Sequence, residues 1–282
     1  MSIGILLAVM AAVGYGAADF IGGLASRRVS HWTVALAGQL AGGAALLVVD
    51  LFLPGNVRAG DVAWALLAGL GSAVGTVSLY RGLARGRMGI VAPVSGVGAA
   101  MVPVLVGVSL GERPTTLVWL GVLVALPAIY LVSRDATHGD VRGLGGLLDG
   151  GLAGLGFGVL FVALAQIPES AGLLPLAANQ GVGAVLTLVL ATALRQPLLP
   201  RERSSRRATA WGAAGGMLGT SGTVAFLLAS HTTHLAVTGV LASLYPAVTV
   251  LLAAVLLRER VRPSQALGLA VCGASVCLVA LG

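Results

Sequence analysis

Charged residues are scarce in this sequence, since Asp, Glu, Lys and Arg make up only 10% of its 282 residues. A soluble globular chain has roughly 25% charged residues, so a water-soluble protein is excluded, because polar groups could not cover its surface. Hydrophobic residues reach 57%, and the mean hydropathy is +0.97. We therefore expect a membrane-embedded protein that contacts membrane lipid over most of its surface.

Lysine is absent, so all 17 basic residues are arginine, which we interpret as codon bias of a GC-rich bacterial genome. The formal net charge of +7 suggests a nucleic-acid partner at first sight. Arginines confined to short loops are better explained by orientation in a membrane, so no nucleic acid is expected. The two cysteines, Cys272 and Cys277, lie on different sides of one predicted helix, so we expect small core residues and no disulfide between them.

Signatures of enzymes and cofactor sites are also missing. The sequence contains no glycine-rich phosphate loop, no Cys-x-x-Cys site and no nucleophile elbow, so we expect neither an enzyme nor a cofactor. His231 and His234 have no carboxylate or cysteine nearby in sequence, so a polar loop is expected there and no metal site. The first apolar run begins at Ile3 without a basic region or cleavage site, which predicts a spanning helix and no signal peptide.

Ten apolar runs are present, each about 20 residues long, which is enough for a helix to cross a bilayer. Uniform apolar runs of this length exclude the strands of a barrel. The sequence therefore predicts an all-α polytopic membrane protein with ten transmembrane helices. They are expected at residues 3–24, 32–53, 61–82, 89–110, 115–133, 144–166, 171–194, 209–230, 235–257 and 264–282.

The two halves of the chain repeat the same pattern. At a spacing of 147 residues, Glu112-Arg113 matches Glu259-Arg260, Trp64 matches Trp211, and Gly75-Thr76-Val77 matches Gly222-Thr223-Val224. Earlier in each half the spacing is about six residues shorter, and Gly14-Tyr15-Gly16 matches Gly156-Phe157-Gly158 while Gln39 matches Gln180. We interpret residues 1–136 and 143–282 as two copies of one five-helix unit.

The odd number of helices in each copy predicts that the second copy is inverted in the membrane. Loops after the odd-numbered helices hold 15 of the 17 arginines, and the other side holds only Arg58 and Arg113. By the positive-inside rule the Arg-rich side is cytoplasmic, which places both termini outside. Inverted repeats are typical of secondary transporters, whose halves rock around a site near the midplane.

The Glu-Arg pairs belong to a longer pattern. In the second half, 236-AVTGVLASLYPAVTVLLAAVLLRERVRPSQALG-268 places Pro246 thirteen residues before Glu259 and a glycine nine residues after it. The first half reads 89-GIVAPVSGVGAAMVPVLVGVSLGERPTTLVWLG-121, with Ala99 at the expected proline position. This pattern resembles the EamA-like members of the drug/metabolite transporter superfamily.

The resemblance covers nearly the whole chain and includes 13-VGYGAADF-20, which stands where the family often has a Trp-Gly pair. It implies ten helices in two inverted five-helix repeats. It also implies a central cavity lined by helices one to four and six to nine, with helices five and ten peripheral. The activity that it implies is transport of small organic solutes, often efflux of metabolites or drugs.

Asp19 is the sharpest candidate for a functional residue, because it is the only acidic residue well inside a predicted span. A charge at that depth costs on the order of 2.5–3.5 kcal/mol on insertion scales. One interpretation is a proton-coupling or cation-binding carboxylate in a wet cavity. The other is that the helix is shifted and Asp19 pairs with Arg27 or Arg28. Its counterpart in the second repeat is Phe161, so either role would be asymmetric.

Polar and aromatic residues at membrane depth are further candidates for substrate binding. Gln39 and Gln180 occupy matching positions, and Asn179 lies beside the second of them. Their amides either bind polar groups of a substrate or form hydrogen bonds between helices. Tyr15 and Tyr245 either stack on a substrate or pack in the core.

Proline, glycine and glutamate mark positions expected to shape the helices. Pro103 and Pro246 fall inside predicted helices, where each removes a backbone hydrogen bond and can act as a hinge. The ridge of Gly150, Gly154 and Gly158 predicts close helix packing without chemistry. Glu112 is expected to end its helix through capping and an ion pair with its own neighbour, Arg113.

The pattern as a whole predicts a secondary transporter in the cytoplasmic (inner) membrane, as a monomer or homodimer. It would move a small organic solute, metabolite-, amino-acid- or drug-like, by alternating access around a central cavity. The absence of an ATP site favours proton coupling, and the resemblance favours efflux. An intramembrane lipid-modifying enzyme and a non-transporting membrane scaffold remain the alternatives.

Overall fold

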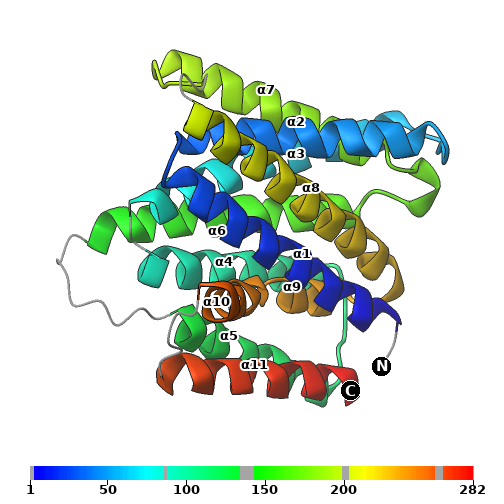
Figure 1. Cartoon of the computed structure of the whole chain (residues 1–282). Coiled ribbons are helices and arrows are strands. Elements are labelled where there is room, and N and C mark those ends of the chain that lie inside the picture. Colours follow the sequence, from blue (N-terminus) through cyan, green and yellow to red (C-terminus); the bar gives the residue numbers. More distant parts are fainter. Residues whose placement is uncertain (1–2, 86–87, 134–142, 199–202, 258–262, 282) are drawn as a thin grey trace.

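The computed structural model describes residues 3–85, 88–133, 143–198, 203–257 and 263–281, and helices take up almost all of them (Figure 1). No strand occurs in these ranges. In chain order the helices are α1 (Ile3–Ser26), α2 (His31–Asp50), α3 (Ala59–Ala84), α4 (Met88–Ser109), α5 (Thr116–Ser133), α6 (Gly143–Ala165), the 3₁₀ turn η1 (Glu169–Ala171), α7 (Leu174–Ala193), α8 (Arg203–Thr232), α9 (Leu235–Ala242), α10 (Tyr245–Leu256) and α11 (Pro263–Leu281).

Seven of the described helical stretches are long and apolar enough to cross a membrane: six single helices, α1, α2, α3, α6, α7 and α8, and the combined stretch Leu235–Leu256. Three more are apolar but shorter: Val94–Ser109, Thr116–Leu131 and Pro263–Leu278. The chain is therefore an all-helical, multi-pass membrane protein. The expected total of ten spans stays a prediction.

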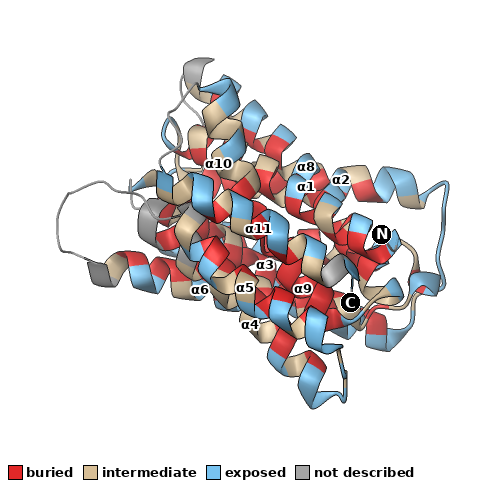
Figure 2. Ribbon diagram, turned by 90° about the horizontal axis from the view of Figure 1, so that it is seen from below, coloured by how far each residue is buried: buried red, intermediate tan, exposed pale blue. Residues whose placement is uncertain are grey.

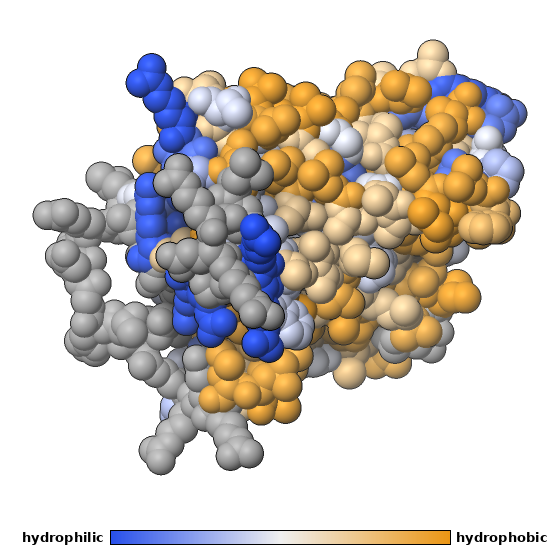
Figure 3. Space-filling model, turned by 45° about the horizontal axis from the view of Figure 1, so that its top comes forward, coloured by the Kyte–Doolittle hydropathy of each residue, from blue (hydrophilic) through white to orange (hydrophobic). Residues whose placement is uncertain are grey.

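The outer surface of the bundle is apolar around its middle. Large side chains such as Leu105, Leu123 and Val185 are about 60% exposed, which suits contact with lipid tails. Hydrophobic residues cover the broad middle of the face in Figure 3, and hydrophilic residues gather toward its ends. Figure 2 shows the complementary arrangement, with buried residues concentrated where the helices face one another.

The ninth expected helix is interrupted in the structure. Residues 235–257 were expected to form one span, but α9 ends at Ala242 and α10 begins at Tyr245. Pro246 is the second residue of α10, where its missing N–H and fixed backbone angle favour a helix start. The Gly239 carbonyl accepts hydrogen bonds from both the hydroxyl and the N–H of Ser243, at 2.6 and 3.0 Å, where α9 ends. Pro103 of α4 packs against Gly239, so both candidate hinge prolines lie near this interruption.

The two halves of the chain interleave in a pseudo-two-fold pattern. Helix α1 packs along α8 as α3 packs along α6, and α2 packs on α8 as α3 packs on α7. The pairs α2–α7 and α5–α11 join each helix to its own counterpart. Matching helices run in opposite directions in Figure 1, as the traces of α1 and α6 show. Neither half therefore has a core of its own.

Glycines allow helices of opposite halves to approach closely. A Cβ atom added at Gly14 of α1 would lie 2.9 Å from the Gly222 Cα atom of α8. At the matching crossing of α6 on α3, a Cβ atom at Gly156 would lie 2.9 Å from the Gly75 Cα atom. The repeated glycines noted in the sequence thus serve the same packing role in both halves.

The loops meet in two groups, one at each end of the bundle. At what we term the Arg-rich end, the Thr33 hydroxyl donates to the Pro197 carbonyl at 3.2 Å. At the opposite end, the Asn56 N–H donates to the Ser170 carbonyl at 2.7 Å. The described arginines of the Arg-rich end are Arg27, Arg28, Arg81, Arg85, Arg195, Arg206 and Arg207.

Glu112 has a partner that the sequence did not indicate. We expected an ion pair with Arg113, but the Glu112 carboxylate accepts hydrogen bonds from the N–H groups of Leu235 and Ala236, at 2.6 and 3.0 Å. The first N–H groups of a helix have no partner within the helix, and they favour a negative charge. Glu112 therefore caps α9 across the two halves. Its counterpart, Glu259, lies outside the described residues.

The glycine ridge of α6 faces α4, as predicted, and it offers a matched test. A Cβ atom at Gly154 would lie 2.9 Å from the Gly98 Cα atom, whereas one at Gly151 would meet no atom within 4 Å. We predict that Gly154→Ala lowers the free energy of unfolding by roughly 1–3 kcal/mol through overpacking. Gly151→Ala should instead raise it by up to about 1 kcal/mol, because alanine is the better helix former.

The comparison uses thermal unfolding of both variants in detergent, followed by circular dichroism. Equal melting temperatures for Gly154→Ala and Gly151→Ala would mean that α4 and α6 do not approach as closely as described.

Candidate functional site

A cavity lies between the two halves, and α1, α2, α3, α6, α7, α8 and α10 contribute to its wall. Helix α4, which the family resemblance implied would line the cavity, contributes none of the described lining residues, and neither do α5, α9 and α11. Helices α5 and α11 pack against each other. The empty space, including the open solvent at its mouth, is about 710 Å³. The polar and aromatic lining residues are Tyr15, Asp19, Gln39, Ser72, Thr76, Tyr80, Phe157, Phe161, Gln180, Thr220, Thr223 and Tyr245.

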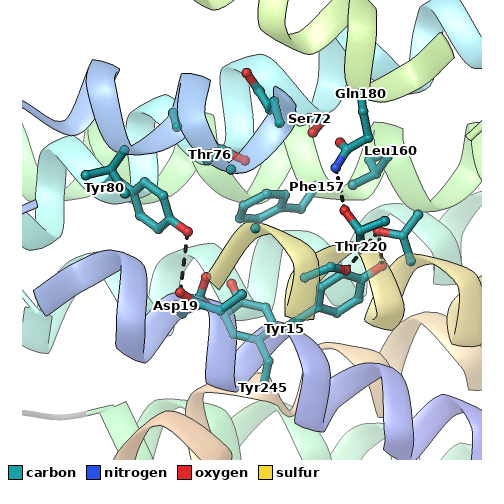
Figure 4. Close-up of a pocket in the computed structure, with 18 of the residues that line it drawn as sticks. Tyr15, Asp19, Ser72, Thr76, Tyr80, Phe157, Leu160, Gln180, Thr220 and Tyr245 are labelled. Atoms are coloured by element: carbon teal, nitrogen blue, oxygen red, sulfur yellow. Dashed lines mark hydrogen bonds between the residues drawn. The ribbon is translucent and has the colours of Figure 1, made fainter. Parts of the chain in front are cut away.

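Asp19 faces this cavity from α1 (Figure 4). Tyr80 and Tyr245 lie beside it in the cavity wall, and the Tyr80 hydroxyl donates a hydrogen bond to the carbonyl of the preceding residue, Ala18. Among the described residues, no hydrogen bond or ion pair involves the Asp19 carboxylate. This placement favours the cavity interpretation over pairing with Arg27 or Arg28, although the role of the carboxylate stays a prediction.

Aromatic rings surround much of the cavity. Three of the four tyrosines of the chain line it, together with Phe157 and Phe161. The Tyr15 ring lies 5.6 Å from Phe161, and the Phe157 ring meets Tyr245 edge to face at 6.4 Å. The Tyr245 hydroxyl forms a 2.7 Å hydrogen bond with the Ser95 hydroxyl of α4, which fixes the start of α10 against the first half.

The two matched glutamines form hydrogen bonds to different helices: Gln39 of α2 bonds to α7, and Gln180 of α7 bonds to α8. The Gln39 side-chain oxygen accepts a hydrogen bond from the Thr187 hydroxyl at 3.0 Å, and Gln180 Nε2 donates to the Thr220 hydroxyl at 2.6 Å. Both glutamines line the cavity, so each bridges helices and borders the site. Gln39 Nε2 is buried without a hydrogen-bond partner among the described residues.

Asn179 differs from its glutamine neighbour. It is buried and does not line the cavity. Its Oδ1 atom has no hydrogen-bond partner among the described residues. Asn179 occupies the position that corresponds to Gly38, and its backbone carbonyl packs against Gly69 of α3. The cavity wall thus includes five of the six expected substrate-binding residues, and Asn179 lies behind it.

Sequence reasoning missed the hydroxyl groups of the cavity. Thr76 and Thr223 line it at matching positions of α3 and α8. Both belong to the repeated Gly-Thr-Val motif, which we used only as evidence of duplication. A polar residue kept at the same place in both repeats, at membrane depth, was the signal that could have identified them. Ser72 and Thr220 had no comparable signal.

Asp149 is the second functional candidate that was missed. Its side chain on α6 is only 3% exposed and accepts a hydrogen bond from Arg81 Nε of α3 at 2.8 Å. Arg85 lies 3.8 Å from its second oxygen. This ion pair joins the two halves at the Arg-rich end, next to Tyr80 of the cavity. Asp149 falls near the start of an apolar run, so its depth could not be judged from sequence.

His231 and His234, at the end of the bundle opposite the Arg-rich end, occupy structural positions. His231 Nε2 donates a hydrogen bond to the Ile167 carbonyl at 2.7 Å, and His234 precedes the first turn of α9. In the described part of the chain, no group of three His, Cys, Asp or Glu side chains is arranged to hold a metal ion.

Comparison with known proteins identifies the family to which this chain belongs. The sequence matches the EamA-like transporter family over residues 2–134 and 145–281. The chain belongs to the EamA-like transporter family. A crystal structure with 18% sequence identity matches this EamA-like chain with a TM-score of 0.71, over 96% of this chain and 98% of the other. At that identity the likeness shows the fold alone. No curated protein sequence matches the chain.

The hydrogen bond between Tyr245 and Ser95 can be tested on its own. We predict that Tyr245→Phe lowers the free energy of unfolding by about 1–3 kcal/mol, because it leaves the buried Ser95 hydroxyl without a partner. Tyr130→Phe is the control, since Tyr130 is half-exposed on the outer surface. Thermal unfolding in detergent measures both. A Tyr245→Phe protein as stable as Tyr130→Phe would contradict the assignment of this contact.

Proposed function

We propose that this EamA-like protein is a secondary transporter that moves a small organic solute across the cytoplasmic membrane by alternating access. The observation that carries the proposal is a polar, aromatic cavity with one carboxylate, formed between two interleaved halves. Membership of a transporter family supports it at a coarse level. Opposite helix directions in the two halves support ten spans in inverted repeats, 1–136 and 143–282.

Different contacts flank the cavity toward its two ends. Toward the Arg-rich end, the ion pair of Arg81 with Asp149 joins α3 to α6. Toward the opposite end, the Phe161 and Phe226 rings are stacked at 4.4 Å within a cluster of fully buried apolar side chains that includes Ile167. We propose that these two layers open in turn. Rocking of the halves would break one layer while the other stays packed.

Asp19 is the proposed coupling group, because it is the only carboxylate among the described residues of the cavity wall. A carboxylate that takes up a proton on one side and releases it on the other links solute flux to the proton gradient. A cytoplasmic Arg-rich end and efflux complete the proposal. The arginine distribution supports the orientation, and the resemblance to the EamA-like family supports efflux.

Alternating access is tested without knowledge of the solute. We expect a Thr76→Cys variant, in a background with Cys272→Ser and Cys277→Ser, to react with a membrane-impermeant maleimide from either side of the membrane. Right-side-out and inside-out vesicles provide the two sides. A Cys at the exposed loop residue Asn56 is the control and should react from one side only. Reaction of Thr76→Cys from one side alone would count against alternating access.

The proposed charged layer is tested in the same assay. We expect Asp149→Asn to speed the labelling of Thr76→Cys from the Arg-rich end by roughly tenfold or more, since a shift of about 1.4 kcal/mol between the two states is sufficient. Arg206→Gln changes an exposed charge at the same end and should leave the rate unchanged. An unaltered rate in Asp149→Asn would show that the ion pair does not hold this end closed.

A further inference from the structure

The described part of the cavity wall carries charge of one sign only, which is negative. Asp19 is the only charged side chain among the described lining residues, and no arginine or histidine accompanies it. The nearest arginine along the chain from Tyr80 is Arg81, and its guanidinium is committed to Asp149. A negative group of a solute would therefore enter a low-dielectric site without a partner. A positive group would offset the cost of holding the Asp19 carboxylate at membrane depth.

Three hydroxyl groups of the cavity support the same conclusion. Thr223 donates its hydrogen to the Gly219 carbonyl at 3.1 Å, Tyr80 to the Ala18 carbonyl at 3.4 Å, and Tyr15 to the Thr223 oxygen at 3.4 Å. What these three oxygens still offer to a solute is lone pairs. Such acceptors suit a ligand that donates hydrogen bonds, as a protonated amine does.

The aromatic rings favour a cation as well. Tyr80 and Tyr245 lie on either side of Asp19, and Tyr15 and Phe157 continue the wall (Figure 4). The faces of aromatic rings attract ammonium groups, most strongly where water is excluded. A carboxylate flanked by such rings is a pattern suited to a primary to quaternary amine.

The part of the wall formed by α2 and α7 carries no charge. Gln39 of α2 and Gln180 of α7 line the cavity there with neutral amides. Gln180 Nε2 already donates to the Thr220 hydroxyl, and the buried Gln39 Nε2 lies against Gly183 of α7. A neutral polar group of the solute suits this wall, whereas a carboxylate there would lack a balancing charge.

We infer that the solute of this transporter is an organic amine or ammonium that carries no carboxylate, held by Asp19 and the tyrosines around it. The inference rests on the proposed function and specifies the class of solute. Of the metabolite-, amino-acid- and drug-like solutes expected from the sequence, it excludes those that are amino-acid-like, because a zwitterion would leave its negative end unpaired. The decarboxylated counterpart of an amino acid has the required chemistry: an ammonium at one end and a neutral polar group at the other.

The test compares tyramine with tyrosine, which differ only in the carboxylate. Binding of each to the purified full-length protein in lipid nanodiscs is measured by isothermal titration calorimetry, with choline as a second amine. We expect both amines to bind, and tyrosine to bind at least tenfold more weakly than tyramine. Asp19→Asn should lose binding of the amines, and Asp19→Glu, which keeps the charge, should retain part of it.

Glu169→Gln is the control, because it removes an exposed carboxylate outside the cavity and should bind tyramine normally. Melting temperatures of the Asp19 variants establish that they are folded. Tyrosine binding as tight as that of tyramine, unchanged tyramine binding in folded Asp19→Asn, or no binding of either amine at millimolar concentration would overturn the inference. Maleimide labelling of Thr76→Cys from both sides would then still support the transporter, so the two failures are distinguishable.

Discussion

The close approach of helices from opposite halves is the constraint on which this structure depends. Lipid provides no hydrophobic force that drives helices together, so tight packing must hold them. Glycines at the α1–α8 and α3–α6 crossings bring backbones into contact, and each crossing joins one half to the other. The cavity lies between these contacts. Its wall consequently changes shape whenever one half moves against the other.

Residues that recur in both repeats and residues that occur in only one repeat have different roles. The glycine crossings occur twice, and so do the glutamines that bridge neighbouring helices beside the cavity, because both halves must pack in the same way. The carboxylates of the cavity wall and of the ion pair at the Arg-rich end each occur once. Asp19 corresponds to Phe161, and Asp149 corresponds to Leu7 in the first repeat. Features shared by the repeats therefore build the scaffold, whereas unique residues give the cavity its charge and the Arg-rich end its ion pair.

The helices and the duplication were accessible from sequence, because apolar length and matched motifs are local signals. The partner of Glu112 was not, since Leu235 lies 123 positions away and only packing brings it near. Asp149 sits at the edge of an apolar run, where hydropathy cannot separate a loop from a buried ion pair. Asn179 and Gln180 are neighbours in sequence, yet helix geometry turns only Gln180 into the cavity.

A charged contact flanks one end of the cavity and an apolar contact flanks the other. The free energy needed to separate the charged contact can nevertheless be close to that needed to separate the apolar one. Separating the Arg81–Asp149 pair loses Coulomb attraction and returns two charges to water, and these terms largely cancel. Separating the Phe161–Phe226 stack loses contact area between two rings, and part of that area can be covered by a solute or by neighbouring side chains. Near-balance between the two openings is what a two-state transporter needs, because a small differential affinity of the solute can then shift the population.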